Sequence, residues 1–144
     1  MKQLIQSEDI LLHRKIEKCS YDLDRKKISK ELHENMIHHE GVGLSANQIG
    51  IHERVFVMIR DMEYNEVITC FNPKILKYSR QTSIMEEGCL SYAGLFLKIE
   101  RPNFVVVKYE DVDKHYHKIK LDGFAARVFQ HEYDHMEGVD FTQR

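Results

Sequence analysis

Two histidines and a glutamate near the C-terminal end have the spacing of a metal-dependent hydrolase. Residues 131–135 have the sequence HEYDH, which fits the pattern H-E-x-x-H. On a helix, residues four apart lie on one face, so His131 and His135 can bind one metal ion. Glu132 is rotated away from His131 by about a quarter of a turn, close enough to meet a water on that metal. The five-residue pattern also occurs on solvated helix faces, so it needs further ligands nearby.

A catalytic metal site of this kind needs a third protein ligand. Such sites usually use three protein ligands and keep one position for water. The candidates are carboxylates or a cysteine, and Cys89 lies in the run EEGCLS, where Gly88 permits a tight turn around the sulfur. Cys89 is therefore a candidate ligand in a loop, and a buried free thiol is the alternative.

A second group of histidines does not have the spacing of a metal site. Ile37 occupies the position where a partner for His33 would be needed, and His33 and His38 point in directions well over a quarter-turn apart on a helix. We predict that these histidines and His39 are surface residues.

Composition indicates one globular domain over residues 1–144. Hydrophobic residues make up 42% and charged residues 31% of the chain, as in ordinary soluble domains. The net charge of −2 gives no long-range attraction to phosphate backbones, so we expect no direct nucleic acid partner. No signal peptide and no apolar run of about 20 residues is present, which favours a cytoplasmic protein without membrane contact. Three cysteines without paired spacing argue against a disulfide framework, and we interpret Cys19 and Cys70 as buried thiols.

The elements that would position these residues are two helices and several strands. Ile28, Leu32 and Met36 recur every four positions and predict an amphipathic helix over residues 24–40, with Asp24 as its cap and Gly41 at its end. A second helix is predicted to follow Asp122-Gly123 and to end at Gly138. Strands are expected over four segments, residues 54–59, 67–71, 104–109 and 115–121, the last of them half-exposed. The chain is therefore predicted to be an α+β domain, with antiparallel strands packed around the helix that carries H-E-x-x-H.

Three sequence blocks together resemble the peptide deformylases, a family recognised by G-x-G-L-A-A-x-Q, E-G-C-L-S and H-E-x-D-H. This chain has GVGLSANQ at residues 41–48, EGCLS at 87–91 and HEYDH at 131–135. The three blocks occur in order and well separated, and the likeness extends from about Leu11 to Phe141.

The resemblance implies an enzyme of protein biosynthesis, a hydrolase that removes the formyl group from the N-terminal formylmethionine of nascent polypeptides and releases formate. Cys89, His131 and His135 would bind one divalent metal, Fe²⁺ in the cell, with Zn²⁺, Ni²⁺ or Co²⁺ as alternatives. Glu132 would act as general acid and base. The side-chain amide of Gln48 and the backbone N–H of Leu90 would stabilise the negative charge that develops on oxygen.

The resemblance also suggests residues around this centre. Four candidates would bind substrate, and ordinary core packing is their alternative: Val42, Gly43, Phe124 and Val128. Glu87 and Arg101 are expected to pair and so support the Cys89 loop, with a surface ion pair as the alternative.

Four positions depart from the family pattern. Ser45 replaces the usual Ala, a small-for-small change from which we expect no effect. Ala93 replaces a Pro, which would free the backbone beside the ligand loop. Phe96 stands where bacterial members commonly have Arg, and Arg127 stands where they have an apolar residue. We expect these last two to alter side-chain selectivity.

The chain ends at Arg144 without the further helix that many bacterial members use to dock on the ribosome. This leaves ribosome association open and resembles the short deformylases carried by phages, which would act in the cytoplasm of a bacterial host. We expect a monomer. Two other functions fit part of the pattern: a general H-E-x-x-H metallopeptidase, and a deformylase-like module that binds formyl peptides without turnover.

Overall fold

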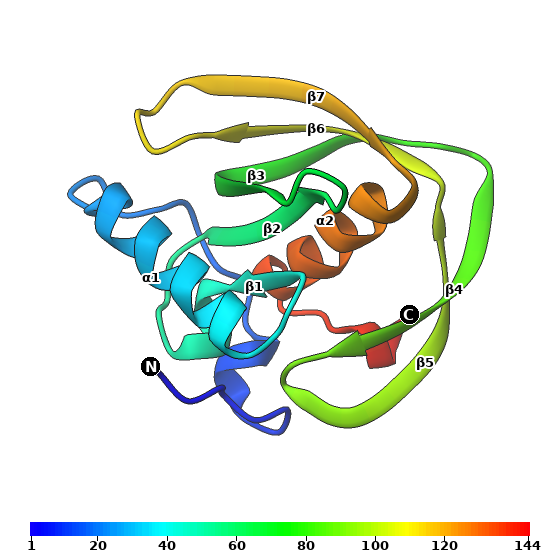
Figure 1. The fold of residues 1–144 in the computed structure, drawn as a ribbon, viewed down its shortest axis with the longest axis horizontal. Helices are drawn as coiled ribbons and strands as arrows, with labels where there is room; N and C mark the ends of the chain where they lie inside the picture. Colours follow the sequence, from blue (N-terminus) through cyan, green and yellow to red (C-terminus); the bar gives the residue numbers. More distant parts are fainter.

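The computed structural model describes residues 1–144 and contains a five-stranded sheet, a two-stranded hairpin and two α-helices (Figure 1). The sheet has the order β1-β2-β3-β6-β7, and the hairpin is formed by β4 and β5. Every strand pairing is antiparallel. The strands are β1 Gly43–Ser45, β2 Val55–Asp61, β3 Glu66–Tyr78, β4 Thr82–Cys89, β5 Tyr92–Pro102, β6 Phe104–Glu110 and β7 Tyr116–Asp122. The helices are α1 Arg25–His38 and α2 Gly123–Met136, with short 3₁₀ helices at Ile10–His13, Ala46–Ile49 and Phe141–Gln143.

The two helices pack against opposite faces of the sheet. Successive side chains of a strand point to opposite faces, so β2 contributes to two cores. Phe56 and Met58 belong to the core that contains Phe129 of α2, whereas Val55 and Val57 belong to the core beneath α1. In Figure 1, α2 lies in the middle of the molecule, between the five-stranded sheet and the β4–β5 hairpin. This central position buries the H-E-x-x-H run, and the expected α+β arrangement is confirmed.

Helix α1 begins as predicted but ends differently. The Asp24 side chain accepts a hydrogen bond from the Lys27 backbone N–H at 3.1 Å, which confirms the predicted cap. The predicted end at Gly41 is wrong, because Glu40 adopts the left-handed conformation, with φ of 58°. The backbone N–H groups of Glu40 and Gly41 bond to the carbonyls of Ile37 and Met36, which is the Schellman pattern with Glu40 where glycine is common.

The four predicted strands and the second helix are present. Strand β7 is half-exposed, with Ile119 and Leu121 facing the core and Tyr116 facing outward. Helix α2 ends at Met136, and Gly138 follows in the left-handed conformation, with φ of 73°. No helix of the structure has the length and apolar character needed to cross a membrane.

The β4–β5 hairpin was not predicted, and it corrects the expectation of a loop around Cys89. Cys89 is the last residue of β4 and pairs with Tyr92, after a register shift between Gly88 and Cys89. Gly88 lies close beneath Phe96: a Cβ there would lie 2.7 Å from a ring carbon of Phe96, so the ring would have to shift. The hairpin therefore holds the cysteine on a strand end, and the Phe96 ring packs over the adjacent glycine.

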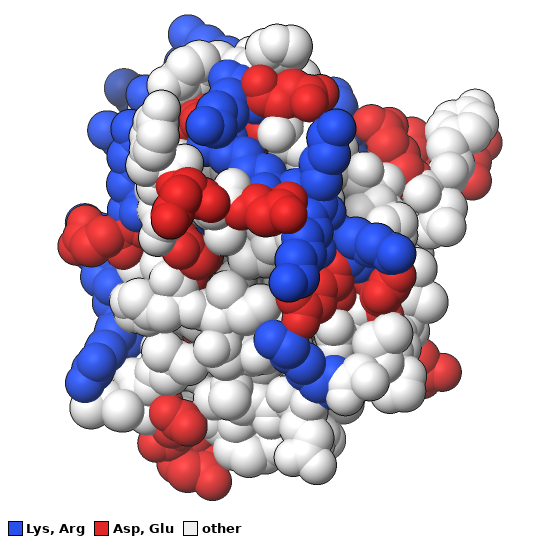
Figure 2. Space-filling view, turned by 90° about the vertical axis from the view of Figure 1, so that its left-hand side faces the viewer, with Lys and Arg blue, Asp and Glu red and all other residues white.

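Acidic and basic side chains are mixed on the molecular surface. Figure 2 shows the two kinds next to one another across the upper part of one face, whereas much of the lower part is uncharged. This mixture agrees with the small net charge of −2.

Candidate metal centre

Two elements bring three candidate metal ligands together. Helix α2 places His131 and His135 one turn apart, with ring centroids 5.3 Å from each other. The end of β4 places the Cys89 sulfur 3.5 Å from Nε2 of His135. One ligand atom from each of the three residues lies within 4.8 Å of the other two. Nitrogen and sulfur ligands lie about 2.0–2.3 Å from a zinc-type ion, so this spacing fits three corners of a tetrahedral site.

The charge environment of His131 also favours a cation. Its Nδ1 lies 3.0 Å from Oε1 of Glu87, so this nitrogen donates a hydrogen bond to the carboxylate and Nε2 faces the cysteine. Burial opposes a charge on the ring, yet the hydrogen bonds to Cys89 and Glu87 raise the pKa of His131 to about 10. The anionic partners that stabilise this proton would equally stabilise a metal ion, which would bind Nε2 of the neutral ring in place of the proton.

His135 is suited to bind a metal as a neutral ring. Burial, helped by the charge on His131, lowers the pKa of His135 to about 3. The neutral imidazole is the form that coordinates metal ions.

Glu87 forms a buried anchor for this centre. Arg101 donates two hydrogen bonds to it, from Nε at 2.6 Å and from Nη2 at 2.9 Å. Burial alone would raise the pKa of Glu87, but the hydrogen bonds from His131 and Arg101 lower it to about 2. The expected Glu87–Arg101 pair is present, and the surface alternative is wrong because both side chains are about 95% buried.

Arg127, which was expected to alter side-chain selectivity, lies between the cleft and the buried Glu87. Its guanidinium donates to Glu87 Oε2 at 2.6 Å and to the carbonyls of Ile99 and Ser83. These contacts point the guanidinium toward the buried carboxylate of Glu87. Part of the Arg127 side chain still lines the adjoining cleft. An apolar residue could not make these bonds.

Glu132 lies beside the three ligands and is almost fully buried. Burial raises the pKa of Glu132 to about 7, although the charge of His131 opposes the shift. Its Oε1 has no hydrogen-bond partner within the protein. A carboxyl group with a pKa near neutrality can both accept and donate a proton, so this free oxygen is placed for acid–base chemistry.

The Gln48 amide faces the same centre in a fixed orientation. Its Oε1 accepts a hydrogen bond from the Ser45 backbone N–H at 3.0 Å, and the Ser45 hydroxyl lies at the same distance. Its Nε2 lies 3.2 Å from the Ser91 hydroxyl and 3.6 Å from the Cys89 sulfur. The oxygen is thus held away from the site and the N–H groups point toward it. Ser45, from which no effect was expected, contributes to this orientation.

Gln48, Cys89, His131 and Glu132 line the floor of a cleft of about 470 Å³, and His135 lies behind them, 3.5 Å from the Cys89 sulfur. Leu90 lines this cleft. The four predicted substrate-binding residues line it as well: Val42, Gly43, Phe124 and Val128. Val128 is also part of the core, which agrees with the alternative of ordinary core packing. Phe124 is 42% exposed and does not. Phe96, which is 63% exposed, lines the cleft as well. Apolar walls thus surround a polar floor.

Comparison with known proteins places this arrangement in a family. A family model described as polypeptide deformylase matches residues 1–144. The chain belongs to the peptide deformylase family. The predicted resemblance is confirmed, and the three family blocks meet in space at the β1 region, the end of β4 and helix α2.

Relatives from bacteria and a phage share this deformylase fold. The peptide deformylase of Thermotoga maritima is 44% identical over 124 residues, which cover 86% of this chain and 74% of that protein. The crystal structure of the T. maritima deformylase superposes on 100% of this chain with a TM-score of 0.91 and 37% sequence identity. The superposition includes 97% of the T. maritima chain. A probable peptide deformylase from synechococcus phage S-SSM7 covers 99% of each chain, at 35% identity and a TM-score of 0.90. The structure of a deformylase from Acinetobacter baumannii with Met-Ala-Ser bound superposes on 100% of this chain with a TM-score of 0.92 and 27% sequence identity. The superposition includes 98% of the A. baumannii chain.

Sequence reasoning missed two residues of this deformylase site. The Asn47 side-chain amide donates to the backbone carbonyl of His135 at 3.1 Å and so ties the Gln48 segment to α2. The carboxylate of Asp134 accepts from Arg101 at 2.9 Å. Both residues lie inside the recognised blocks, so their position beside the named residues was the available signal.

Proposed function

We propose that this chain is a metal-dependent peptide deformylase, which hydrolyses the formyl group from the N-terminal methionine of nascent polypeptides and releases formate. One observation carries the proposal: Cys89, His131, Glu132 and Gln48 line one cleft, and His135 completes the group of three ligand atoms beside it. Membership of the family supports the same reaction. The A. baumannii structure with Met-Ala-Ser supports a peptide that begins with methionine as the ligand class.

The side chains of the floor divide the reaction between them. A divalent metal held by Cys89, His131 and His135 would activate water and polarise the formyl group. Glu132 accepts a proton from the attacking water and later donates one to the leaving amine. The Gln48 amide and the Leu90 backbone N–H donate hydrogen bonds to the oxygen on which negative charge develops. One such donor is typically worth about 10²–10³-fold in rate.

The donor set supports Fe²⁺ as the metal in the cell, with Zn²⁺, Ni²⁺ and Co²⁺ as substitutes. One thiolate and two imidazoles form a softer and more electron-rich set than three imidazoles, and all four ions accept such ligands. A thiolate beside an open position is also sensitive to oxidation, so Cys89 would be the point of inactivation in air.

The cleft supports an extended peptide with its methionine side chain among apolar residues. β1 is an edge strand of the sheet, and the β4–β5 hairpin borders the same cleft. Edge strands offer unpaired backbone groups to an extended peptide. Val42, Phe124 and Val128 would contact the methionine, and Gly43 would pair with the peptide backbone.

The cellular setting is a further part of the proposal. The likeness to the phage S-SSM7 structure supports a phage-type deformylase. We propose that it acts as a monomer in the cytoplasm of a bacterial host. Its partners there would be formylated nascent chains.

The experiment is formate release from formyl-Met-Ala-Ser by anaerobically prepared protein loaded with iron or nickel. The expected result is turnover by the wild type and none by Glu132→Ala at equal metal content. Binding of the peptide without formate would refute the proposal in favour of a binding module. Full activity of Cys89→Ser would refute the ligand set and favour a general metallopeptidase.

A further inference from the structure

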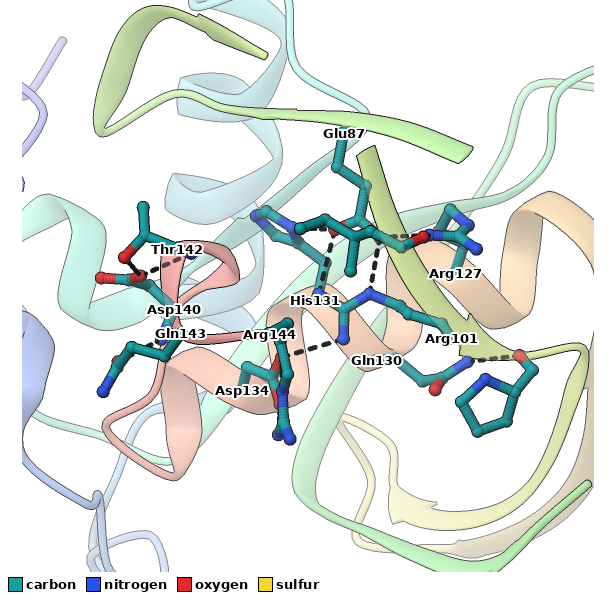
Figure 3. A network of polar contacts seen from close by, with 12 residues as sticks. Glu87, Arg101, Arg127, Gln130, His131, Asp134, Asp140, Thr142, Gln143 and Arg144 are labelled. Atoms are coloured by element: carbon teal, nitrogen blue, oxygen red, sulfur yellow. Dashed lines mark hydrogen bonds and ion pairs between the residues drawn. The ribbon is translucent and has the colours of Figure 1, made fainter. Parts of the chain in front are cut away.

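A continuous line of ion pairs joins Arg144 to the candidate ligand His131 (Figure 3). The Arg144 guanidinium contacts both oxygens of Asp134, from Nη2 to Oδ1 at 2.6 Å and from Nε to Oδ2 at 3.1 Å. Asp134 Oδ2 also accepts from Nη1 of Arg101 at 2.9 Å. Arg101 in turn holds Glu87 with two hydrogen bonds, and Glu87 accepts from Nδ1 of His131.

We propose that Arg144 is a positioning residue for the metal centre, which acts through Asp134, Arg101 and Glu87 on the ring orientation of His131. The inference rests on the metal site of the proposed function and adds a residue outside all three family blocks. Arg144 does not line the cleft, so it has no direct contact with a substrate there.

The bonding of Asp134 explains why Arg144 matters. Asp134 is 3% exposed, and its Oδ1 accepts its only hydrogen bond from Arg144. Without Arg144, a buried charged oxygen would lose its partner, and leaving such a group unsatisfied is costly. Asp134 would then rotate toward water or toward Arg101, and either movement disturbs the pair between Arg101 and Glu87.

The shape of the contacts transmits this disturbance. Arg144 and Arg101 each engage a carboxylate through two nitrogen atoms, and such forked contacts fix the plane of the carboxylate as well as its position. Glu87 determines which nitrogen of His131 carries the proton and how the ring is turned. A rotation at Asp134 therefore reaches the ligand through its single hydrogen bond to Arg101 and then through the two-nitrogen contact of Arg101 with Glu87.

The segment that carries Arg144 is itself fixed against the site. Phe141 is buried and lies 5.6 Å from the His131 ring, between ring centroids. The Asp140 side chain caps the 3₁₀ helix Phe141–Gln143, accepting from the Thr142 backbone N–H at 2.8 Å. Arg144 is thus presented to Asp134 by an ordered turn, although 46% of its side chain is exposed.

The test measures metal loss from Arg144→Ala and Arg144→Lys in the presence of an excess of chelator. Partners of a metal-binding histidine typically contribute 10–100-fold to metal affinity or activity, and Arg144 lies further out, so we expect Arg144→Ala to lose metal about 3–10-fold faster. The rate of metal loss from Arg144→Lys should lie between those of Arg144→Ala and the wild type, because an ammonium group keeps the charge but cannot make the two-nitrogen contact with Asp134. The visible spectrum of the Co²⁺ form should shift in Arg144→Ala, and kcat should fall while KM is retained.

The matched control is Arg60→Ala, which breaks an exposed pair with Glu66 at 3.7 Å, away from the cleft. It should leave metal loss and the Co²⁺ spectrum unchanged. Wild-type metal loss and an unshifted spectrum in Arg144→Ala would overturn the inference, and if this variant does not fold, the same readings on Arg144→Lys decide. Formate release by the wild type with unchanged metal loss in Arg144→Ala would overturn only the Arg144 role. Faster metal loss in Arg144→Ala, with no formate release by the wild type, would overturn only the proposed function.

Discussion

Gly43 packs directly against the carboxyl group of Glu132. A Cβ at position 43 would lie 2.6 Å from Oε2 and 3.0 Å from Cγ of Glu132. Strand β1 thus forms one wall against the candidate acid–base group, and only a residue without a side chain leaves that group in place. The second glycine of the block at residues 41–48 is explained by this close approach rather than by backbone freedom.

Gly43→Ala should therefore lower kcat by about 10²-fold, since a misplacement of about 1 Å can cost this much. The added methyl group would push the Glu132 carboxyl group away from the cleft floor, while the three metal ligands remain untouched. Steady-state formate release together with metal analysis measures both effects. Val42→Ala is the matched control. It removes apolar contacts from the cleft at the adjacent position and should raise KM instead of lowering kcat. A wild-type kcat in Gly43→Ala would refute this role for the close contact.

Ser45→Ala should reduce kcat by about 2–10-fold, which corresponds to the roughly 0.5–1.5 kcal/mol of one hydrogen bond. The Ser45 hydroxyl has one proton, shared between Asn47 Oδ1 at 2.7 Å and Gln48 Oε1 at 3.0 Å, so the variant loses both contacts but keeps the bond from its own backbone N–H to Gln48. Gln48→Leu removes the donor itself and should cost about 10²-fold or more. Rates at saturating peptide compare the two variants. Equal losses in both, or no loss in Ser45→Ala, would contradict the orienting role of the hydroxyl.

Only one of the three cysteines should react with iodoacetamide at pH 8, and only without metal. Burial raises the pKa of Cys19 to about 11 and that of Cys70 well above its usual value, so both remain thiols. Cys89 lines the cleft and would be protected by a bound metal. Peptide mass mapping should find alkylated Cys89 after chelation and no alkylation with the metal in excess. His135→Ala should lose the protection, and equal labelling of wild-type Cys89 in both states would argue against ligation.

The helix-borne part of the site could be predicted because its signals are local. Residues four apart define a helix face, so the relation of His131 to His135 follows from spacing alone. The family blocks then linked distant segments that no periodicity connects. Asp24 could likewise be identified as a cap from its position before an apolar repeat.

The parts that were missed depend on long-range contacts. Most of β4 is exposed, so it lacks the alternation of buried and exposed residues that marks a strand in sequence. Gly88 could suggest a turn, whereas its close contact is with the ring of Phe96, eight positions away. Arg127 contacts Glu87 from another element, and its charge gave no indication that it would be buried.

Asp140 should stabilise the fold in a pH-dependent way. Burial would raise the pKa of Asp140, but hydrogen bonds from Thr142 and Tyr92 outweigh it and hold the pKa below its usual value. A lowered folded-state pKa gives stability that is present above the unfolded value of about 4 and is lost as the pH falls through the folded value. Asp140→Asn should therefore lower the free energy of unfolding by about 1–2 kcal/mol at pH 7, and the difference should shrink below about pH 4.

Urea unfolding across this pH range measures the difference, with Asp22→Asn as the control. Asp22 is exposed and makes no hydrogen bond through its side chain, so its substitution should change stability by less than about 0.5 kcal/mol at either pH. A difference for Asp140→Asn that stays constant from pH 7 to below pH 4 would show that the residue stabilises the turn through packing rather than through its ionised carboxylate.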